Sequence, residues 1–555
     1  MSAAVESSTP KEEVFIKHPW AIFPLLYLMQ AMPVHIVQDV STLVYKDMGL
    51  PNAEIVRWTS LIALPWSMQF LLGPLVDFNA TKRRWILGAQ AIICGCLILA
   101  AFMLGMKEAF QFSLAVLGIA AITSALCNIA TDGFFIISQT KTQQTAMAAV
   151  QTTFYRFGRL LVTWLMVKTA GGMIENGALP ATAWKNVLIA AAIAYFVGYL
   201  INLRQIPVVP SDAPKEQLEP DQNKRNIKRV LLIVLSGIGS YFAANALVRL
   251  IAHGIFQLKG GDPQGPWKGW MLQNPVVDGN VMPVRWGPVF SPFSPVMSEV
   301  VQLGVCAVIA VVAITWVRKL LVKTEMGFAL SSFFQQPGIA AILVFVLFYR
   351  FPEAMVGKMT PLFYKDPITA GGLALTTENV GDIKGLFSVL GIILGGIIGG
   401  WVVHKLGLRK AFWIVALAMH TPNLLYMYLS YNVGTYQSLG SMTLPLIGVQ
   451  VSEKLAWLVG IELIDQAGYG IGYAAYFVYL MQVAQRGKHI TTHYAIASGL
   501  GALCIALAGI LGGIFQSNFG WHGFFFSVIV LGVPALCTLL IIPMDKTTGA
   551  ATASS

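Results

Sequence analysis

Arginine residues interrupt two strongly apolar stretches of this 555-residue sequence. The tetrapeptide FYRF occurs at 154–157 and again at 348–351, so Arg156 and Arg350 each fall inside a predicted membrane span. Arg159 follows Arg156 by three residues and shares its helix face. A charge deep in a span costs roughly 3 kcal/mol, so it usually faces a cavity or a partner. The forked donors of arginine match a carboxylate, which predicts an anion site.

Aromatic and polar neighbours extend this candidate binding site. Tyr155 and Tyr349 are placed to stack on sugar rings, although aromatic residues that face lipid have the same pattern. Glu353 follows Arg350 by three residues, so an ion pair within the helix is an equal alternative to substrate binding at Arg350. The candidate substrate-binding residues are Arg156, Arg159, Arg350, Tyr155, Tyr349 and Gln482.

Acidic residues in the apolar stretches are candidate proton carriers. A carboxyl group in a partly wet cavity of low dielectric can bind and release a proton as access to the cavity alternates. We expect Asp39, Asp132 and Asp465 to be the strongest candidates, whereas the nearby Arg350 would hold Glu353 ionised. The candidate proton-coupling residues are Asp39, Asp132, Glu353, Glu462 and Asp465.

The composition predicts the membrane helices that must position these residues. The chain is 56% hydrophobic and 11% charged, and its apolar stretches of about 20 residues are long enough to cross a bilayer as helices. The strands of a membrane barrel would be about half that length and would alternate. We predict fourteen spans, near 21–45, 55–77, 85–106, 112–137, 146–172, 184–204, 230–254, 295–317, 337–361, 383–404, 411–431, 454–482, 490–516 and 522–542.

The net charge of +11 is explained by membrane topology. Basic residues concentrate in alternate loops, such as 81–84, 223–229 and 404–410. This is the positive-inside pattern, which places those loops in the cytoplasm and needs no nucleic-acid partner. An even number of spans then places both termini in the cytoplasm.

The spans form two groups of six around an inserted pair. The pair has no counterpart in the two groups, so we expect it to pack outside the twelve-helix body. The predicted units are a cytoplasmic tail (1–18), an N-terminal six-helix bundle (19–206), a cytoplasmic linker (207–229), two extra helices with a long periplasmic loop (230–335), a C-terminal six-helix bundle (336–544) and a second cytoplasmic tail (545–555).

A loop is repeated in the two groups of six. GPLVDFNATKRR begins at Gly73, and GWVVHKLGLRK begins 327 residues later at Gly400. The two copies of FYRF are 194 residues apart, outside that register, so we attribute their identity to chance. Charged side chains of the repeated loop are candidates for a cytoplasmic latch, or gate. They are Asp77, Lys82, Arg83, His404 and Arg409.

The repeated loop resembles the signature loop of the major facilitator superfamily, whose members have two six-helix halves related by a pseudo-twofold axis. Five segments resemble the AmpG-type muropeptide permeases, which also insert two helices between the halves. Ala80, Asn128 and the long loop 258–293 depart from the family pattern, and the similarity to acetyl-CoA transporter relatives is weaker. The segments are NIATDGFF, FYRFGRLL, YRFPEAMVGKMTPLF, GGIIGGWVVHKLGLRKAF and FVYLMQVAQRGKHITTHYAIASGLGAL.

The resemblance implies a monomeric, multi-pass secondary transporter that imports anhydromuropeptides across a bacterial cytoplasmic membrane. The arginines independently suggest an anionic solute, and the buried acids suggest proton symport. Alternatives are a permease for acidic oligosaccharides or disaccharides, or for an acyl-CoA-like solute.

A membrane receptor or enzyme without transport activity is a less favoured alternative from a different class. The sequence contains no P-loop, HExxH or GxSxG motif and no His/Cys cluster with metal spacing. We therefore predict no catalysis, cofactor or metal.

Overall fold

The structure is a computed structural model of the chain. It describes residues 16, 18–69, 72–73, 76, 80–106, 108–210 and 212, parts of 228–258, four short strands within 276–290, and residues 295–321, 325–443, 450–487 and 490–544. Short antiparallel hairpins are formed by β1 (Val276–Val277) with β2 (Asn280–Val281), by β3 (Arg285–Trp286) with β4 (Val289–Phe290), and by β5 (Ser441–Thr443) with β6 (Gln450–Ser452).

The N-terminal half (19–206) is a bundle of long helices. In hydrocarbon only a helix satisfies every backbone group within its own segment, so apolar stretches of this length fold as helices. Its elements are α1 (Pro19–His35), the π-helix η1 (Ile36–Val40), α2 (Ser41–Asp47), α3 (Asn52–Ile62), α4 (Leu64–Ser67), α6 (Lys82–Met103), α7 (Ala109–Ile137), α8 (Lys141–Leu160), the π-helix η2 (Leu161–Met166), α9 (Val167–Glu175) and α10 (Pro180–Gln205).

The remaining helices follow the polar linker. The longest, α22, is broken at Gly520, whose φ of 66° and ψ of −171° are not helical. This break lies between the last two predicted spans. The elements are α12 (Pro295–Leu321), α13 (Glu325–Phe334), α14 (Ile339–Phe348), α15 (Phe351–Lys365), the 3₁₀-helix η4 (Ile368–Ala370), α16 (Thr377–Val380), the π-helix η5 (Gly381–Phe387), α17 (Ser388–Leu406), α18 (Leu408–His420), α19 (Asn423–Tyr431), α20 (Val433–Ser438), α21 (Glu453–Gln485) and α22 (Ile490–Ile541).

Eight helices among the described residues are long and apolar enough to cross a membrane. This supports an all-helical, multi-pass membrane protein, but the predicted count of fourteen spans is not confirmed. The eight are Pro19–Asp47, Lys82–Met103, Ala109–Ile137, Pro180–Gln205, Ile339–Lys365, Thr377–Leu406, Leu408–Tyr431 and Thr492–Ile541.

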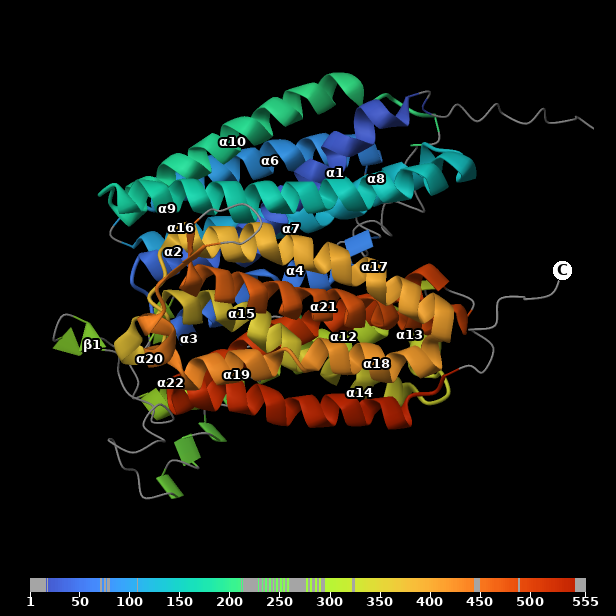
Figure 1. Ribbon diagram of the computed structural model, residues 1–555. Coiled ribbons are helices and arrows are strands. Elements are labelled where there is room, and N and C mark those ends of the chain that lie inside the picture. Colours follow the sequence, from blue (N-terminus) through green and yellow to red (C-terminus); the bar gives the residue numbers. More distant parts are fainter. Residues whose placement is uncertain are drawn as a thin grey trace, which may run out of the picture.

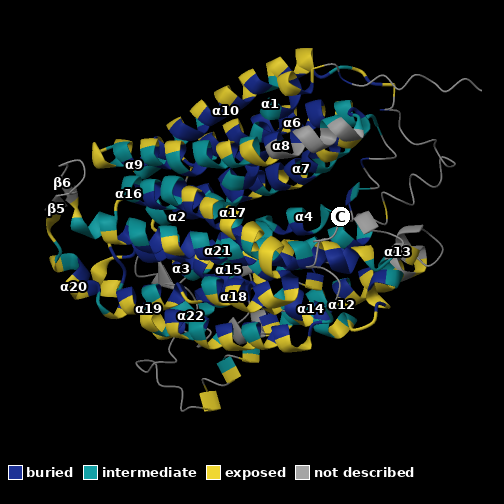
Figure 2. Cartoon of the chain, turned by 45° about the vertical axis from the view of Figure 1, so that its right-hand side comes forward, coloured by how far each residue is buried: buried dark blue, intermediate teal, exposed yellow. Residues whose placement is uncertain are grey.

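The helices form two groups. Figure 1 shows α6, α8, α9 and α10 together on one side, and α17, α18, α19, α21 and α22 on the other. Figure 2 shows exposed residues along the outward faces of α10 and α22, and buried residues on the faces that meet other helices. The exposed residues of α10 include Ile193, Phe196 and Val197. An apolar outer surface of this kind suits contact with lipid.

The two halves meet closely near one end of the bundle, which we call the closed end. Here α9 packs on α16 and η2 packs on η5. A Cβ atom built on Gly171 would lie 2.2 Å from the backbone nitrogen of Glu378, and one on Gly385 would lie 2.5 Å from the carbonyl oxygen of Thr163. The halves therefore approach at backbone distance, and only glycine fits at these two contacts.

The helix α12 belongs to the predicted inserted pair. A Cβ on Gly239, in the partly described helical stretch before it, would lie 3.0 Å from the carbonyl oxygen of Cys306. The α12 side chains Val308, Val311 and Trp316 are exposed. The position of this pair outside the two bundles stays a prediction, and the linker 213–227 lies outside the described residues.

Candidate substrate cavity

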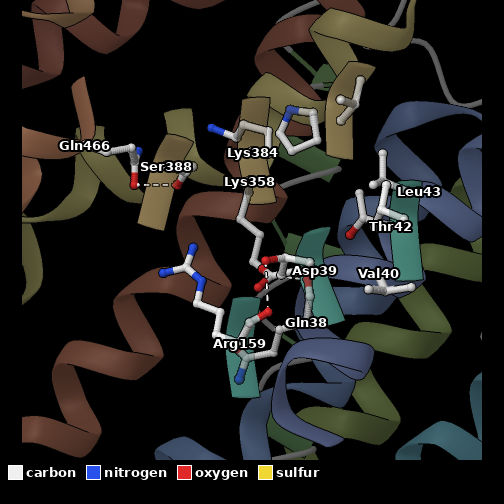
Figure 3. A pocket seen from close by; sticks show the side chains of 15 residues that line it. Gln38, Asp39, Val40, Thr42, Leu43, Arg159, Lys358, Lys384, Ser388 and Gln466 are labelled. Atoms are coloured by element: carbon white, nitrogen blue, oxygen red, sulfur yellow. Dashed lines mark hydrogen bonds between the residues drawn. The ribbon is translucent and has the colours of Figure 1, made fainter. Parts of the chain in front are cut away.

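A cavity lies between the two halves, beside the closed end. It spans about 640 Å³ of empty space, part of which is open solvent. Figure 3 shows that its walls come from segments of both halves. Its polar lining residues are Gln38, Asp39, Thr42, Arg159, Thr163, Lys358, Lys384, Ser388 and Gln466.

Three π-helical turns contribute to the cavity wall. Asp39 lies in η1, Thr163 in η2 and Lys384 in η5, and all three residues line the cavity. A π-helical turn accommodates one extra residue and often marks a functional site. No sequence pattern predicts these turns, because each lies in an otherwise ordinary apolar helix.

The charges that line the cavity are mostly positive. Arg159, Lys358 and Lys384 line it, and Asp39 is the one carboxylate among the lining residues. The Nε of Arg159 is buried and has no hydrogen-bond partner among the described residues. Lys358 donates from its Nζ to the carbonyl oxygen of Gln38 at 3.1 Å. The cavity therefore has cationic groups available for an anionic ligand.

Asp39 is tied to its own helix. Its Oδ2 lies 2.8 Å from Nδ1 of His35, and its side chain remains 42% exposed. Tyr155 meets the ring of His35 edge-on at a centroid distance of 5.8 Å. Of these candidates, Asp39 and Arg159 line the cavity, whereas Tyr155 contacts His35 and is not itself a lining residue.

A buried carboxylate cluster lies behind the opposite wall. We define it as Glu353, Glu462 and Asp465, which are 3%, 0% and 0% exposed. Lys384 donates to both carboxylate oxygens of Glu462, at 2.9 Å and 3.1 Å. The hydroxyl of Tyr426 donates to Glu462 at 3.0 Å and lies 3.4 Å from Asp465. The predicted proton-coupling residues therefore fall into separate groups, with three of them in this cluster.

The cluster is also linked to the cavity through neutral groups. Gln466 donates from its Nε2 to Asp465 at 2.7 Å, and its Oε1 accepts from the hydroxyl of Ser388 at 3.2 Å. Both Gln466 and Ser388 line the cavity. One oxygen of Glu353 and one of Asp465 are buried without a hydrogen-bond partner among the described residues.

Arg350 is held by aromatic rings rather than by an acid. It donates to the hydroxyl of Tyr469 at 2.5 Å, and its guanidinium carbon lies 4.7 Å from the ring centroid of Tyr473 and 5.3 Å from that of Tyr476. No ion pair joins it to Glu353 in the described part of the chain. The alternative of a structural pair within the helix is therefore not observed, and cation–π contacts take its place.

Three other candidate binding residues do not line the cavity. Arg156 is half-buried, and its Nη2 lies 3.8 Å from the position of a Cβ on Gly396 of α17. Tyr349 is fully buried, and its ring stacks on Tyr476 at 5.9 Å. Gln482 is buried towards the other end of α21. Of the three candidate arginines, Arg159 is the one that lines the cavity.

Asp132 forms a separate site in the N-terminal half. It is exposed, and the hydroxyl of Tyr27 donates to its Oδ1 at 3.4 Å. It lines neither the cavity nor the carboxylate cluster.

The candidate latch residues that the structure describes are not brought together. Asp77 lies outside the described residues, and His404 and Arg409 are exposed. The Nε of Arg83 donates to the carbonyl oxygen of Ile206 at 2.8 Å, and the backbone nitrogens of Lys82 and Arg83 donate to Asp212 at 2.7 Å and 2.9 Å. Asp212 thus caps α6, and these contacts remain within the region that ends the N-terminal half.

The closed end carries a reciprocal lock that the sequence analysis did not predict. Lys46 pairs with Asp366, and Lys365 pairs with Asp47 at 2.7 Å, so each half supplies one lysine and one aspartate. All four side chains are at most 16% exposed. Each carboxylate is held further, Asp366 by Trp521 at 2.9 Å and Asp47 by Trp184 at 2.9 Å.

A tripeptide in the sequence would have revealed this lock. The residues Tyr-Lys-Asp occur at 45–47, where the first span ends, and again at 364–366, where the first span of the second group ends. A further ion pair, Lys168 with Asp382 at 2.8 Å, also joins the halves at the closed end. The duplicated tripeptide, rather than FYRF, marks equivalent positions of the two halves.

This chain spans less than half the length of two curated relatives that it matches. No family model matches the sequence. Over 210 residues the chain is 25% identical to the AmpG 4 protein of Rickettsia conorii, which is named as a candidate transporter, and the match covers 38% of this chain and 44% of that protein. The anhydromuropeptide permease of Escherichia coli K12 is 23% identical over 213 residues, and the match covers 38% of each chain.

Solved transporter structures share the fold over nearly the whole chain. A peptide transporter POT in complex with sulfate has a TM-score of 0.56 at 15% identity, with 94% of this chain and 95% of that chain covered. A mutant of the nucleoside transporter NupG has a TM-score of 0.53 at 11% identity, with 94% and 99% covered. The chain therefore has the major facilitator fold of these proteins, and part of its sequence resembles AmpG-type transporters.

Proposed function

We propose that this chain is a secondary active transporter that imports an anionic, sugar-containing solute such as an anhydromuropeptide, together with protons, across a bacterial inner membrane. The sequence relatives support the solute class, and the shared fold supports transport. With both termini in the cytoplasm, the closed end faces outward and the cavity opens towards the cytoplasm.

One observation carries the anionic part of this proposal. The cavity between the halves is lined by Arg159, Lys358 and Lys384 but by a single acid, Asp39. Charges at such depth are costly unless partners or water compensate them. Lys384 is balanced by Glu462, whereas Arg159 and Lys358 form no ion pair among the described residues. An anionic solute would supply their counter-charge, and the guanidinium of Arg159 can donate two parallel hydrogen bonds to a carboxylate.

Substitution of Arg159 tests the solute class. We expect Arg159→Gln to weaken binding of an acidic anhydromuropeptide about tenfold to a hundredfold, because a lost charged contact costs roughly 1.5–3 kcal/mol. Binding of the same compound with its carboxylates methyl-esterified should change little. Calorimetric titration of the purified protein measures both affinities, and the exposed Arg204→Gln is the matched control. Equal weakening for both compounds would show that Arg159 only supports the structure.

We propose Asp132 as a proton carrier of the N-terminal half. It is exposed at a site where it accepts from one tyrosine hydroxyl and forms no ion pair among the described residues. We expect Asp132→Asn to abolish the response of uptake to an imposed pH gradient in proteoliposomes, while exchange of solute without a gradient continues. Gradient-driven accumulation equal to that of the unmodified protein would exclude this residue.

A further inference from the structure

We infer that Lys384 couples solute binding to proton binding, by serving both the cavity and the carboxylate cluster. This inference rests on the proposed function and names the side chain through which the two ligands influence each other. Lys384 is the one residue of the described chain that both lines the cavity and forms an ion pair with the cluster.

The cluster holds more negative charge than its single ion pair can balance. Glu462 and Asp465 lie on consecutive turns of α21, and Glu353 on α15 is within electrostatic reach of both. The groups that face them are Lys384 from η5, Tyr426 from α19, Tyr364 from α15, Arg350 just before α15, and Gln466 from α21. Only Lys384 among these forms an ion pair with a member of the cluster.

Three buried carboxylates beside one ammonium cannot all be ionised at low cost. Two like charges in a buried site disfavour each other, so a proton is shared among them. The oxygens of Glu353 and Asp465 that have no donor among the described residues are the places where such a proton can reside. The cluster is therefore a proton-binding site whose occupancy depends on where the Lys384 ammonium lies.

An anion in the cavity competes with Glu462 for this ammonium. Lys384 lies at the boundary, with its side chain 15% exposed, whereas Glu462 is fully buried. When the anion takes the ammonium, Glu462 loses its counter-charge, and its carboxylate binds a proton from water. Solute binding and proton binding then favour each other, which is the linkage that symport requires.

The hydrogen bonds of Glu462 make it able to hold the proton. The hydroxyls of Tyr364 and Tyr426 donate to its Oε2 at 3.1 Å and 3.0 Å. Its Oε1 has Lys384 as its hydrogen-bond partner, at 2.9 Å. Departure of the ammonium would leave this oxygen free to carry the proton without loss of the two tyrosine contacts.

Calorimetric titration with an anhydromuropeptide, repeated in buffers of different ionisation enthalpy, counts the protons taken up on binding. We expect the unmodified protein to take up about one proton per solute near neutral pH, as linkage of two sites requires. Lys384→Gln should still bind, through Arg159 and Lys358, but without proton uptake. Glu462→Gln should also lose proton uptake and should bind about tenfold more tightly, because Lys384 is then free for the anion.

Arg159→Gln is the matched control in this experiment. It weakens binding but leaves Lys384 and the cluster intact, so its proton uptake should equal that of the unmodified protein. Proton uptake that persists in Lys384→Gln, or that disappears equally in Arg159→Gln, would overturn the inference.

A measurement without solute separates this inference from the proposed function. Infrared spectroscopy of the carboxyl stretch reports protonated carboxyl groups directly. In Lys384→Gln the cluster should hold one more proton at neutral pH than in the unmodified protein. Adding Glu462→Gln to Lys384→Gln should remove that increase. If neither the unmodified protein nor the variants bound anhydromuropeptide but this infrared change was observed, only the proposed identity of the solute would be rejected. An unchanged infrared band would reject the role of Lys384.

Discussion

Lys46→Gln combined with Lys365→Gln is expected to open the closed end well over a hundredfold more often than in the unmodified protein. The lock holds four side chains that are at most 16% exposed, and each lysine balances an aspartate of the other half. Removing one member of a buried ion pair costs about 3 kcal/mol or more, which corresponds to about a hundredfold. In the open state water hydrates the unpaired aspartates, so the substitutions destabilise the closed state and not the open state.

Labelling of a cysteine from outside measures this opening. Thr42 lines the cavity and is 3% exposed, so Thr42→Cys in right-side-out vesicles should react with an impermeant maleimide only while the closed end is open. Each single lysine variant should label at an intermediate rate, because the other pair remains. A double variant that labels no faster than the unmodified lock would show that these pairs do not control access.

Gly385→Val is expected to reduce uptake roughly a hundredfold, by keeping the halves apart at the closed end. A Cβ at this position would lie 2.5 Å from both the carbonyl oxygen of Thr163 and the Cα of Trp164. Overpacking costs about 1–3 kcal/mol even among side chains, and backbone atoms yield less. The protein should still fold, because this contact joins the two halves and lies outside the core of either one.

The same two assays test this variant. Gly385→Val should accumulate little solute, and Thr42→Cys in its background should be labelled readily from outside. Gly95→Val is the matched control, since Gly95 is exposed in α6 and a Cβ there would meet nothing within 4 Å. Normal uptake by Gly385→Val would mean that the halves need not approach this closely during the cycle.

The sequence predicted the membrane helices and the fold because both depend on apolar length and on a repeated loop. It also singled out Asp39 and Arg159, which both line the cavity, while their roles stay predictions. Spacing along one helix was sufficient for Arg159, because residues three apart share a helix face.

The sequence did not predict which buried charges meet across helices. Lys384 was overlooked because it lies close to the predicted start of a span, where a lysine usually extends towards water. Its partner Glu462 is 78 residues away, and no local pattern links them. The environment of Arg350 was likewise hidden, since the three tyrosines around it lie on α21, more than a hundred residues later.

Arg350, held by its three tyrosines, gives the C-terminal half a permanent positive charge. A guanidinium does not lose its proton in proteins, and the rings that hold it cannot accept one from it. Its attraction for anions is therefore the same at every pH and in every protonation state of the carboxylate cluster. If Lys384 couples the two ligands as proposed, loss of the protons weakens only the part of the attraction that passes through Lys384. Release of an anionic solute would then be completed by motion of the two halves, which changes the distance over which this fixed charge acts.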